Sequence, residues 1–229
     1  MMEEKRLTIL MPCLNEEETI EFCIREAQQF IQKNYLNAEI LIVDNGSEDL
    51  SAQIARELGA RVILEERRGY GNAVRAGIRN AKGTYIIMGD CDGSYDFRNL
   101  TPFVKKLDDG YSLVVGNRLC GEMEKGAMPP LHRYVGVPLL SWLARKRFQI
   151  ENVQDFHCGQ RGFCRETAQK MLFRTEGMEF ATEMIVEFAQ TGEPICEVPI
   201  VLRKDRRNGR PHLRTFRDGW RHLRYIIKM

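Results

Sequence analysis

The chain has 229 residues, with 43% hydrophobic and 29% charged side chains, an ordinary composition for a globular domain with a sizeable core. The formal net charge of +2 does not indicate a nucleic-acid partner. Seven cysteines at scattered spacings, without a Cys-x-x-Cys pair, argue against a disulfide frame or a zinc site and favour reduced thiols in the cytoplasm. No secretory signal and no apolar run of about eighteen residues occurs, so neither secretion nor a membrane span is expected here.

The first half of the chain alternates between predicted strands and predicted helices. Asn15 with Glu18 predicts a capping-box start for the first helix, and Pro102 fits the first turn of the fourth. This order is typical of βαβ units and predicts an α/β fold with a mostly parallel sheet flanked by helices. The strands are expected at residues 7–11, 39–43, 61–64, 85–88 and 113–115, and the helices at 15–34, 51–58, 71–81 and 101–107.

The second half is less regular. We expect a loop over residues 121–130 and a helix over 180–190. Strands are expected at 159–164 and 195–202. The stretch 134–148, which contains Trp142, fits either a helix packed on the sheet or an interfacial helix.

A separate segment is predicted at the end of the chain. We expect one domain over residues 1–214 and a basic amphipathic helix over 215–229. That helix carries an apolar stripe, so it fits either docking on its own domain or lying on a membrane surface. The stripe consists of Phe216, Trp220, Leu223 and Ile227.

Polar clusters follow four of the predicted strands, at the edge where such sheets bind ligands. Asp90-Cys91-Asp92 is the most informative, because residues i and i+2 of an extended chain share a face and both carboxylates can reach one cation such as Mg²⁺. Alone, the tripeptide equally fits a strand-ending turn. The four clusters together predict a nucleotide-type site with a metal-bound diphosphate. The other three are Asn15-Glu16, Asp44-Asn45-Gly46-Ser47 and Gly116-Asn117-Arg118.

These motifs resemble glycosyltransferase family 2, which has the GT-A fold and uses nucleotide-sugar donors. Within it, the chain is similar to the polyprenyl-phosphate sugar transferases, of the dolichyl-phosphate mannose or glucose synthase type. The resemblance covers nearly the whole chain, and it leaves open whether the chain is a short member or a piece of a longer membrane protein. It is carried by Met11-Pro12-Cys13-Leu14-Asn15-Glu16, Ile42-Val43-Asp44-Asn45-Gly46-Ser47, Gly69-Tyr70-Gly71-Asn72, Gly89-Asp90-Cys91-Asp92-Gly93-Ser94, Asp155-Phe156-His157-Cys158-Gly159-Gln160-Arg161, Gly177-Met178-Glu179-Phe180 and Pro211-His212-Leu213-Arg214.

The resemblance implies a role for particular residues. Asp90 and Asp92 would carry Mg²⁺ or Mn²⁺, and Asp92 and Arg118 would be catalytic. For Asp155, beside Gly159 and Arg161, we favour a place among the catalytic residues as well. The implied donor-binding residues are Pro12, Leu14, Asn15, Glu16, Asp44, Asn45, Gly71, Asp90, Cys91 and Asp92, and the implied phosphate-binding residues are Arg118, Arg161, Arg206 and Arg207. Ser94 stands where some mannosyl synthases have a Gln metal ligand, which leaves the donor open.

The implied activity is metal-dependent, inverting transfer of a hexose from a UDP- or GDP-sugar to a polyprenyl phosphate at the cytoplasmic membrane face. A phosphate acceptor is already anionic near neutral pH and needs no strong base. A sugar hydroxyl would need one, with Asp155, Glu179 and Glu183 as candidates. For Glu179 we favour an ion pair with a nearby arginine.

Other activities stay open. A family 2 enzyme with a soluble or polysaccharide acceptor is one alternative, although the Gln-x-x-Arg-Trp motif of glycan synthases is missing. A nucleotidyltransferase and a silent nucleotide-sugar-binding module are further alternatives. A nucleotidyltransferase would usually have a Gly-rich, Lys-bearing N-terminal loop, and this chain has none. The intact Asp90 and Asp92 argue against a silent binding module. The donor base, the sugar, the acceptor and the oligomeric state are not fixed by the sequence.

Overall fold

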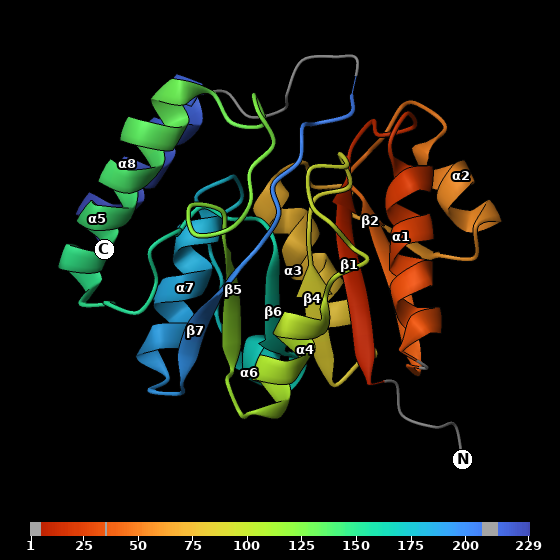
Figure 1. Cartoon of the computed structure of the whole chain (residues 1–229), viewed down its shortest axis with the longest axis horizontal. Helices are drawn as coiled ribbons and strands as arrows, with labels where there is room; N and C mark the ends of the chain where they lie inside the picture. The colour runs from red at the N-terminus through yellow and green to blue at the C-terminus, as the bar shows by residue number, and fades with distance from the viewer. Residues whose placement is uncertain (1–5, 35, 208–214) are drawn as a thin grey trace.

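The computed structural model describes residues 6–34, 36–207 and 215–229, and these build a seven-stranded sheet (Figure 1). The strand order is β3-β2-β1-β4-β6-β5-β7, and every neighbouring pair is parallel except the two pairs formed by β6. The predicted α/β class and mostly parallel sheet are confirmed, whereas the antiparallel direction of β6 was not expected. The strands are β1 (Leu7–Cys13), β2 (Ala38–Asp44), β3 (Arg61–Leu64), β4 (Tyr85–Met88), β5 (Leu113–Asn117), β6 (Arg161–Cys164) and β7 (Ile195–Pro199).

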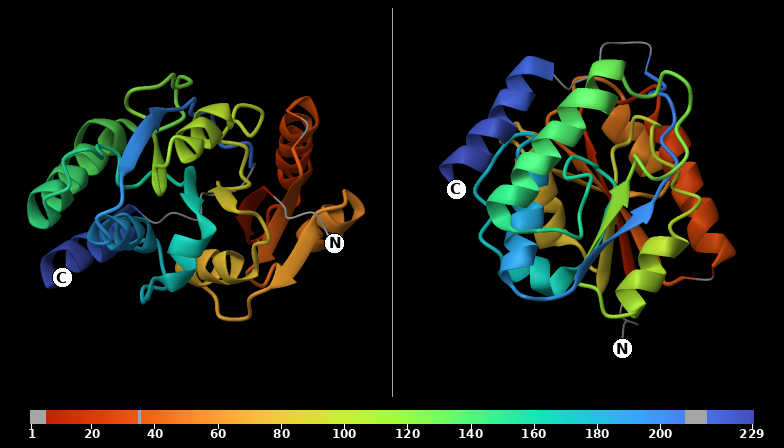
Figure 2. Two further views of the ribbon diagram at one scale, coloured as in Figure 1. Left: turned by 90° about the horizontal axis from the view of Figure 1, so that it is seen from below. Right: turned by 60° about the vertical axis from the view of Figure 1, so that its left-hand side comes forward.

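Helices cover both faces of the sheet. Helices α1 and α4 lie on one face and α3, α6 and α7 on the other, as the view from below shows (Figure 2). The buried strands are apolar at nearly every position because both of their faces are covered. The helices are α1 (Ile20–Lys33), α2 (Ser51–Glu57), α3 (Tyr70–Asn80), α4 (Thr101–Asp108), α5 (Val137–Phe148), α6 (Arg165–Lys170), α7 (Phe180–Gln190) and α8 (Thr215–Lys228), with a π-helical turn η1 (His132–Gly136) before α5.

Helix α1 corrects the predicted capping box. It begins at Ile20, five residues after Asn15, whose backbone is left-handed at φ +54°. The Asn15 side chain instead accepts a hydrogen bond from the backbone N–H of Glu48, at 2.8 Å. Asn15 therefore joins the loop after β1 to the loop after β2, and helix α1 begins beyond this connection.

Helices α5 and α8 form a pair beyond the β5–β7 edge of the sheet, where they lie side by side (Figures 1 and 2). Helix α8 also packs on α7. It docks through His222, Tyr225 and Ile226, which are buried, whereas Trp220 and Ile227 of the predicted apolar stripe are exposed. The helix thus docks on the body of the protein and keeps an apolar face outward. No helix in the described ranges is long and apolar enough to cross a membrane.

Candidate active site

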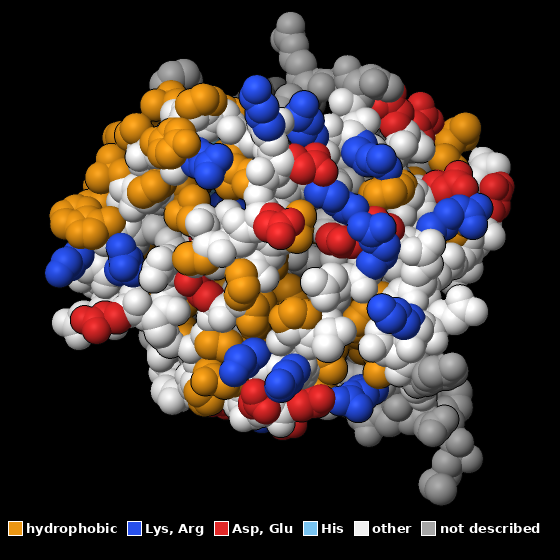
Figure 3. All heavy atoms as spheres, viewed as in Figure 1, with side chains coloured by type: hydrophobic (Ala, Val, Ile, Leu, Met, Phe, Trp, Pro, Cys, Tyr) orange, Lys and Arg blue, Asp and Glu red, His pale blue; other side chains and the backbone are white. Residues whose placement is uncertain are grey.

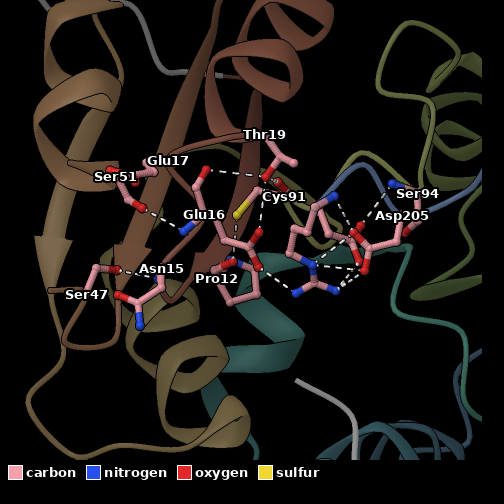
Figure 4. Close-up of polar contacts among 12 residues, drawn as sticks. Pro12, Asn15, Glu16, Glu17, Thr19, Ser47, Ser51, Cys91, Ser94 and Asp205 are labelled. Carbon is pink, nitrogen blue, oxygen red and sulfur yellow. Dashed lines mark hydrogen bonds and ion pairs between the residues drawn. The ribbon is translucent and has the colours of Figure 1, made fainter. Parts of the chain in front are cut away.

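The site lies where the strand order reverses, between the carboxyl ends of β1 and β4. In open α/β sheets this crevice is the usual place for a ligand. Two hydrogen bonds join the loops that follow the two strands (Figure 4). The Cys91 thiol donates to the carbonyl of Pro12 at 3.2 Å, and the Thr19 hydroxyl donates to the carbonyl of Cys91 at 2.7 Å. These contacts fix Asp90 and Asp92 beside Glu16.

The three carboxylates crowd one another. Burial, and then the like charges of Asp92 and Glu16, raise the pKa of Asp90 to about 7. Burial also raises the pKa of Asp92. Like charges held close together in a partly dry site favour protonation or an added cation. The cluster is therefore built to receive positive charge.

Arg207 supplies part of that charge. Its guanidinium donates to Glu16 Oε1 at 2.9 Å, to Asp92 Oδ2 at 3.2 Å and to both oxygens of Asp205. Only 12% of the Arg207 side chain is exposed. One guanidinium thus contacts three carboxylates, those of Glu16, Asp92 and Asp205.

The donor set fits a hard divalent cation bound together with a diphosphate. Two carboxylates are the usual protein share of a magnesium site, since phosphate oxygens and water complete it. The crowded charge on Asp90 and Asp92 agrees with this chemistry. Within residues 6–34, 36–207 and 215–229, no group of three His, Cys, Asp or Glu side chains is arranged to hold a metal by itself. An ion here would depend on oxygen ligands from its substrate.

The predicted donor residues outside the carboxylate cluster and its Cys91 loop divide into two groups. Pro12, Leu14 and Asn15 line the rim after β1, half-buried or exposed, and the Asp44 carboxylate accepts a hydrogen bond from the backbone N–H of Ser47 at 2.9 Å. Pro12, Leu14 and Asn15 are accessible to a ligand, whereas Asp44 is 8% exposed and holds the turn after β2. The second group supports the loops.

That second group is Asn45 and Gly71. The Asn45 amide donates to the carbonyls of Glu65 and Arg67, at 2.8 and 2.9 Å, and accepts from the N–H of Gly69. The N–H of Gly71 donates to the carbonyl of Glu176 at 2.9 Å, and a Cβ at Gly71 would lie 2.5 Å from the carbonyl oxygen of Thr175. Both residues hold backbone in place.

Arg118 and Asp155 form a buried ion pair, and the positive charge of Arg118 acts to lower the pKa of Asp90. The Arg118 side chain donates to both Asp155 oxygens at 2.7 Å, and its backbone N–H donates at 3.2 Å. Burial acts to raise the pKa of Asp155, but Arg118 outweighs it and holds that pKa below its usual range. Asp155 has 0% exposure. Its carboxylate orients Arg118 and is poorly suited to take a proton from a substrate.

Arg161 does not reach the site. Its guanidinium donates to the backbone carbonyls of Phe156, Cys158 and Ala181, at 2.6 to 2.9 Å, and 1% of the residue is exposed. These contacts do not support the predicted phosphate contact, since all the space around the guanidinium is filled by protein. A buried arginine of this kind satisfies carbonyls that no strand or helix serves.

The two other candidate bases are also engaged. Glu179 pairs with Arg221 at 2.9 Å, which confirms the expected ion pair with an arginine. The Glu183 carboxylate accepts hydrogen bonds from the backbone N–H groups of Arg174 and Thr175, at 2.8 and 3.0 Å. Both carboxylates shape the loop before α7. The motif at residues 211–214 lies outside the described residues.

A family model for "Glycosyl transferase family 2" matches residues 8–172. The chain belongs to that family. It is a glycosyltransferase, and the predicted family and enzyme class are confirmed.

Several characterised members are similar to this family 2 chain. A low-salt glycan biosynthesis hexosyltransferase of Haloferax volcanii is 38% identical over 96% of the chain, which spans 53% of that relative. A dolichyl-phosphate hexose transferase of the same organism is 32% identical over 97% of the chain and 93% of its own length. The human dolichyl-phosphate beta-glucosyltransferase is 27% identical over 86% of the chain and 67% of its own length.

Solved structures confirm the GT-A fold. Glucosyl-3-phosphoglycerate synthase of Mycobacterium tuberculosis, in complex with phosphoglyceric acid, superposes with a TM-score of 0.77 over 98% of this chain and 79% of its own, at 22% identity. The same enzyme has been solved with Mn²⁺, UDP and its glucosylated product, at a TM-score of 0.72 over 97% of this chain and 77% of its own, at 23% identity.

Three positions of this glycosyltransferase were missed by reasoning from sequence. Asp205 is the one acid in the basic run 203–207, and that isolation was the available signal. Tyr70 was considered only as part of a motif, yet burial and then the charge of Asp90 raise the pKa of its hydroxyl. Gly159 is required by close packing, because a Cβ there would lie 2.7 Å from Asp90 Oδ2. Each gains its role from a contact between segments distant in sequence.

Proposed function

We propose that this glycosyltransferase moves a hexose from a nucleotide sugar to a polyprenyl phosphate at a membrane surface, with a divalent metal on the donor diphosphate. The convergence of Glu16, Asp90 and Asp92 beside Arg207 is the observation that carries the proposal. Acidic groups that crowd together need a cation, and a cation there attracts a diphosphate. The similarity to dolichyl-phosphate hexose transferases supports the acceptor.

The donor would lie across the ends of β1, β2 and β4. Pro12, Leu14 and Asp44 surround the space where the base and ribose would bind. Asp90 and Asp92 would hold Mg²⁺ or Mn²⁺. When bound, such an ion offsets the charge that develops on the departing nucleoside diphosphate. The family relationship implies inversion at the anomeric carbon.

The state of the candidate bases favours an anionic acceptor. Asp155 is held by Arg118, Glu179 by Arg221, and Glu183 by two backbone N–H groups. A sugar hydroxyl would need one of them to give up its partner before it could take a proton. A phosphate monoester is already ionised near neutral pH. Arg118, fixed beside Asp90 by Asp155, is suited to orient such a phosphate, because a guanidinium binds phosphate in a defined geometry.

A membrane-facing surface is available on α5 and α8. The two tryptophans of the chain, Trp142 and Trp220, both lie there, with exposures of 48% and 64%. Hydrophobic side chains gather over α5 in the space-filling view, on the left of the molecule (Figure 3). Tryptophan at an exposed apolar face with cations around it is typical of helices that lie in a membrane interface. The other exposed members are Tyr134, Val135, Leu139 and Ile227, and the nearby exposed cations are Lys146, Arg147, Arg217, Arg224 and Lys228.

The proposed transfer is tested with purified protein, polyprenyl phosphate in vesicles and a panel of UDP- and GDP-hexoses with Mn²⁺ or Mg²⁺. We expect sugar to appear on the lipid with one donor class, and Asp92→Ala and EDTA to abolish it. A thermal-shift screen of the same donors identifies the base, since a bound ligand raises the melting temperature. Transfer to a soluble sugar but not to the lipid, or full activity in EDTA, would contradict the proposal.

The membrane surface has its own test and a matched control. Vesicles with anionic lipid should float the wild-type protein at low salt, and the double variant Trp220→Ser, Ile227→Ser should stay in solution. Leu64→Ser is the control, because Leu64 is 61% exposed on β3, at the opposite edge of the sheet. If all three proteins float equally, or if the wild-type protein does not float, α8 does not bind the membrane.

A further inference from the structure

The segment 203–207 lies closely over the loop that carries Asp92. The backbone N–H of Arg203 donates to the carbonyl of Ser94 and that of Arg206 to the carbonyl of Asp92, both at 2.9 Å. Gly93, at φ +81°, makes the contact possible, because a Cβ there would lie 2.8 Å from Arg206 Cγ. We call residues 203–207 the strap. It is part of the same surface as the proposed metal site.

The strap is anchored to α1 independently of Arg207. Arg203 forms a two-pronged ion pair with Glu26, with both N–O distances at 2.8 Å. The Arg206 guanidinium lies 3.9 Å from the ring centroid of Phe22, a cation–π contact. Because these anchors are on α1 and not on the carboxylate cluster, the Arg207 side chain can change partners while the strap stays attached.

Arg207 occupies the carboxylate that a metal would need. Asp92 Oδ1 accepts the N–H of Ser94 at 2.9 Å, and Asp92 Oδ2 accepts the Arg207 guanidinium at 3.2 Å. A divalent ion on Asp92 would be brought close to a fixed positive charge in a partly buried site, where repulsion is strong. Free metal and the guanidinium therefore compete for the same oxygen.

A diphosphate removes this competition. It brings negative oxygens to the cluster, and a guanidinium binds such oxygens at least as well as it binds carboxylates. Given the proposed metal-dependent function, on which this step rests, we infer that Arg207 is an exchangeable counter-cation. It neutralises Glu16 and Asp92 in the free enzyme, and it moves to the donor diphosphate when metal and nucleotide arrive together.

The consequence is coupled binding. Wild-type protein should bind Mn²⁺ alone weakly and bind it well in the presence of a nucleoside diphosphate, because only the second ligand offers Arg207 a new partner. By linkage, the metal must raise the affinity for the nucleotide by the same factor. Arg207 thus makes the donor site selective for the metal–diphosphate complex over the free ion.

The test measures Mn²⁺ binding by the electron paramagnetic resonance signal of the free ion, without sugar transfer. Arg207→Met removes the guanidinium and adds no oxygen ligand. We expect Mn²⁺ alone to bind this variant about tenfold more tightly than wild type, within the usual range of coupled sites, and UDP or GDP to raise its Mn²⁺ affinity less. Lys204→Met is the matched control, since it removes a positive charge from the same strap at an exposed side chain that belongs neither to the carboxylate cluster nor to the anchors on α1.

One further variant and the possible outcomes keep the test decisive. If Arg207→Met folds poorly, Arg207→Lys takes its place in the test. The lysine retains the charge without the forked geometry, so its Mn²⁺ affinity should lie between those of wild type and Arg207→Met. Equal or weaker Mn²⁺ binding by Arg207→Met, or the same gain in Lys204→Met, overturns the inference. If wild type then still shows metal-dependent transfer, the proposed function stands without it. If no protein binds Mn²⁺ and transfer is insensitive to EDTA, both fail.

Discussion

Two carboxylates at one edge of the sheet, Asp90 and Asp155, have opposite electrostatic environments. Asp155 is buried with its own arginine, and its pKa is held low. Asp90 is crowded by Asp92 and Glu16, and its pKa is raised to about 7. The fold itself pairs the charge of Asp155, whereas it places the charge of Asp90 next to two further carboxylates. Substitution of the two residues should therefore have opposite effects on stability.

The largest effect on stability is expected from Asp155→Asn. It leaves the Arg118 guanidinium buried without a counter-charge, which typically costs about 3 to 5 kcal/mol. Urea unfolding at pH 7 measures the change, with Arg118→Met, Asp155→Asn as the control that removes both charges and should recover part of the loss. A loss under about 1 kcal/mol would mean that the ion pair is not what holds this side of the site.

Asp90→Asn should reverse the pattern. We expect transfer to fall by about a hundredfold to a thousandfold, the scale seen when one electrostatic partner of a reacting group is lost. The melting temperature of the metal-free protein should stay the same or rise, because the substitution removes a crowded negative charge. A transfer assay and a thermal melt on the same preparation give both values. A variant with lower stability and normal transfer would place Asp90 with Asp155 as a structural carboxylate.

The two residues also predict opposite pH dependences for the metal-free protein. Asp90 has a folded pKa above its unfolded value of about 3.9, so its contribution to stability is present below pH 4 and is lost as the pH rises through about 7. Asp155 has a lowered folded pKa, so its contribution is present above pH 4 and is lost as the pH falls.

Unfolding free energies at pH 5 and pH 8 in EDTA isolate the Asp90 contribution. We expect wild type to lose about 1 to 2 kcal/mol relative to Asp90→Asn over this interval, less than a full three-unit shift because the site is partly solvated. Parallel curves for the two proteins would show that the charge on Asp90 is already compensated.

The comparison also shows what the sequence could and could not reveal. The side proposed for the donor was predictable because its strands are continuous apolar runs and its polar residues follow them directly, as at Asp44 and Asp90. Such features depend on neighbours within a few residues. The parallel pairing of β1, β2 and β4 then brings the strand ends together without further information.

The side proposed for the acceptor depends on contacts between distant residues. Arg118 and Asp155 are 37 residues apart, and no local pattern indicates that they pair. Arg161 and Arg207 look alike in the sequence, yet one is buried among backbone carbonyls and the other faces carboxylates. Helix α6 was missed because six residues are too few for a helical period to be visible. These features follow from packing, which one sequence does not show.

The smallest effect on stability is expected from Glu179→Gln. It breaks the ion pair with Arg221, which joins a carboxylate and a guanidinium as the Asp155–Arg118 pair does but is partly exposed. Arg221 on α8 has 37% side-chain exposure, and solvent screens its attraction to Glu179. Half-exposed pairs contribute about 0 to 1 kcal/mol, so unfolding in urea should hardly change, in contrast to Asp155→Asn. Because the Glu179 pair lies between α8 and the loop before α7, the same variant also tests whether α8 is held by its buried residues. A loss similar to that of Asp155→Asn would mean that the ion pair, and not His222, Tyr225 and Ile226, fixes the helix to the body of the protein.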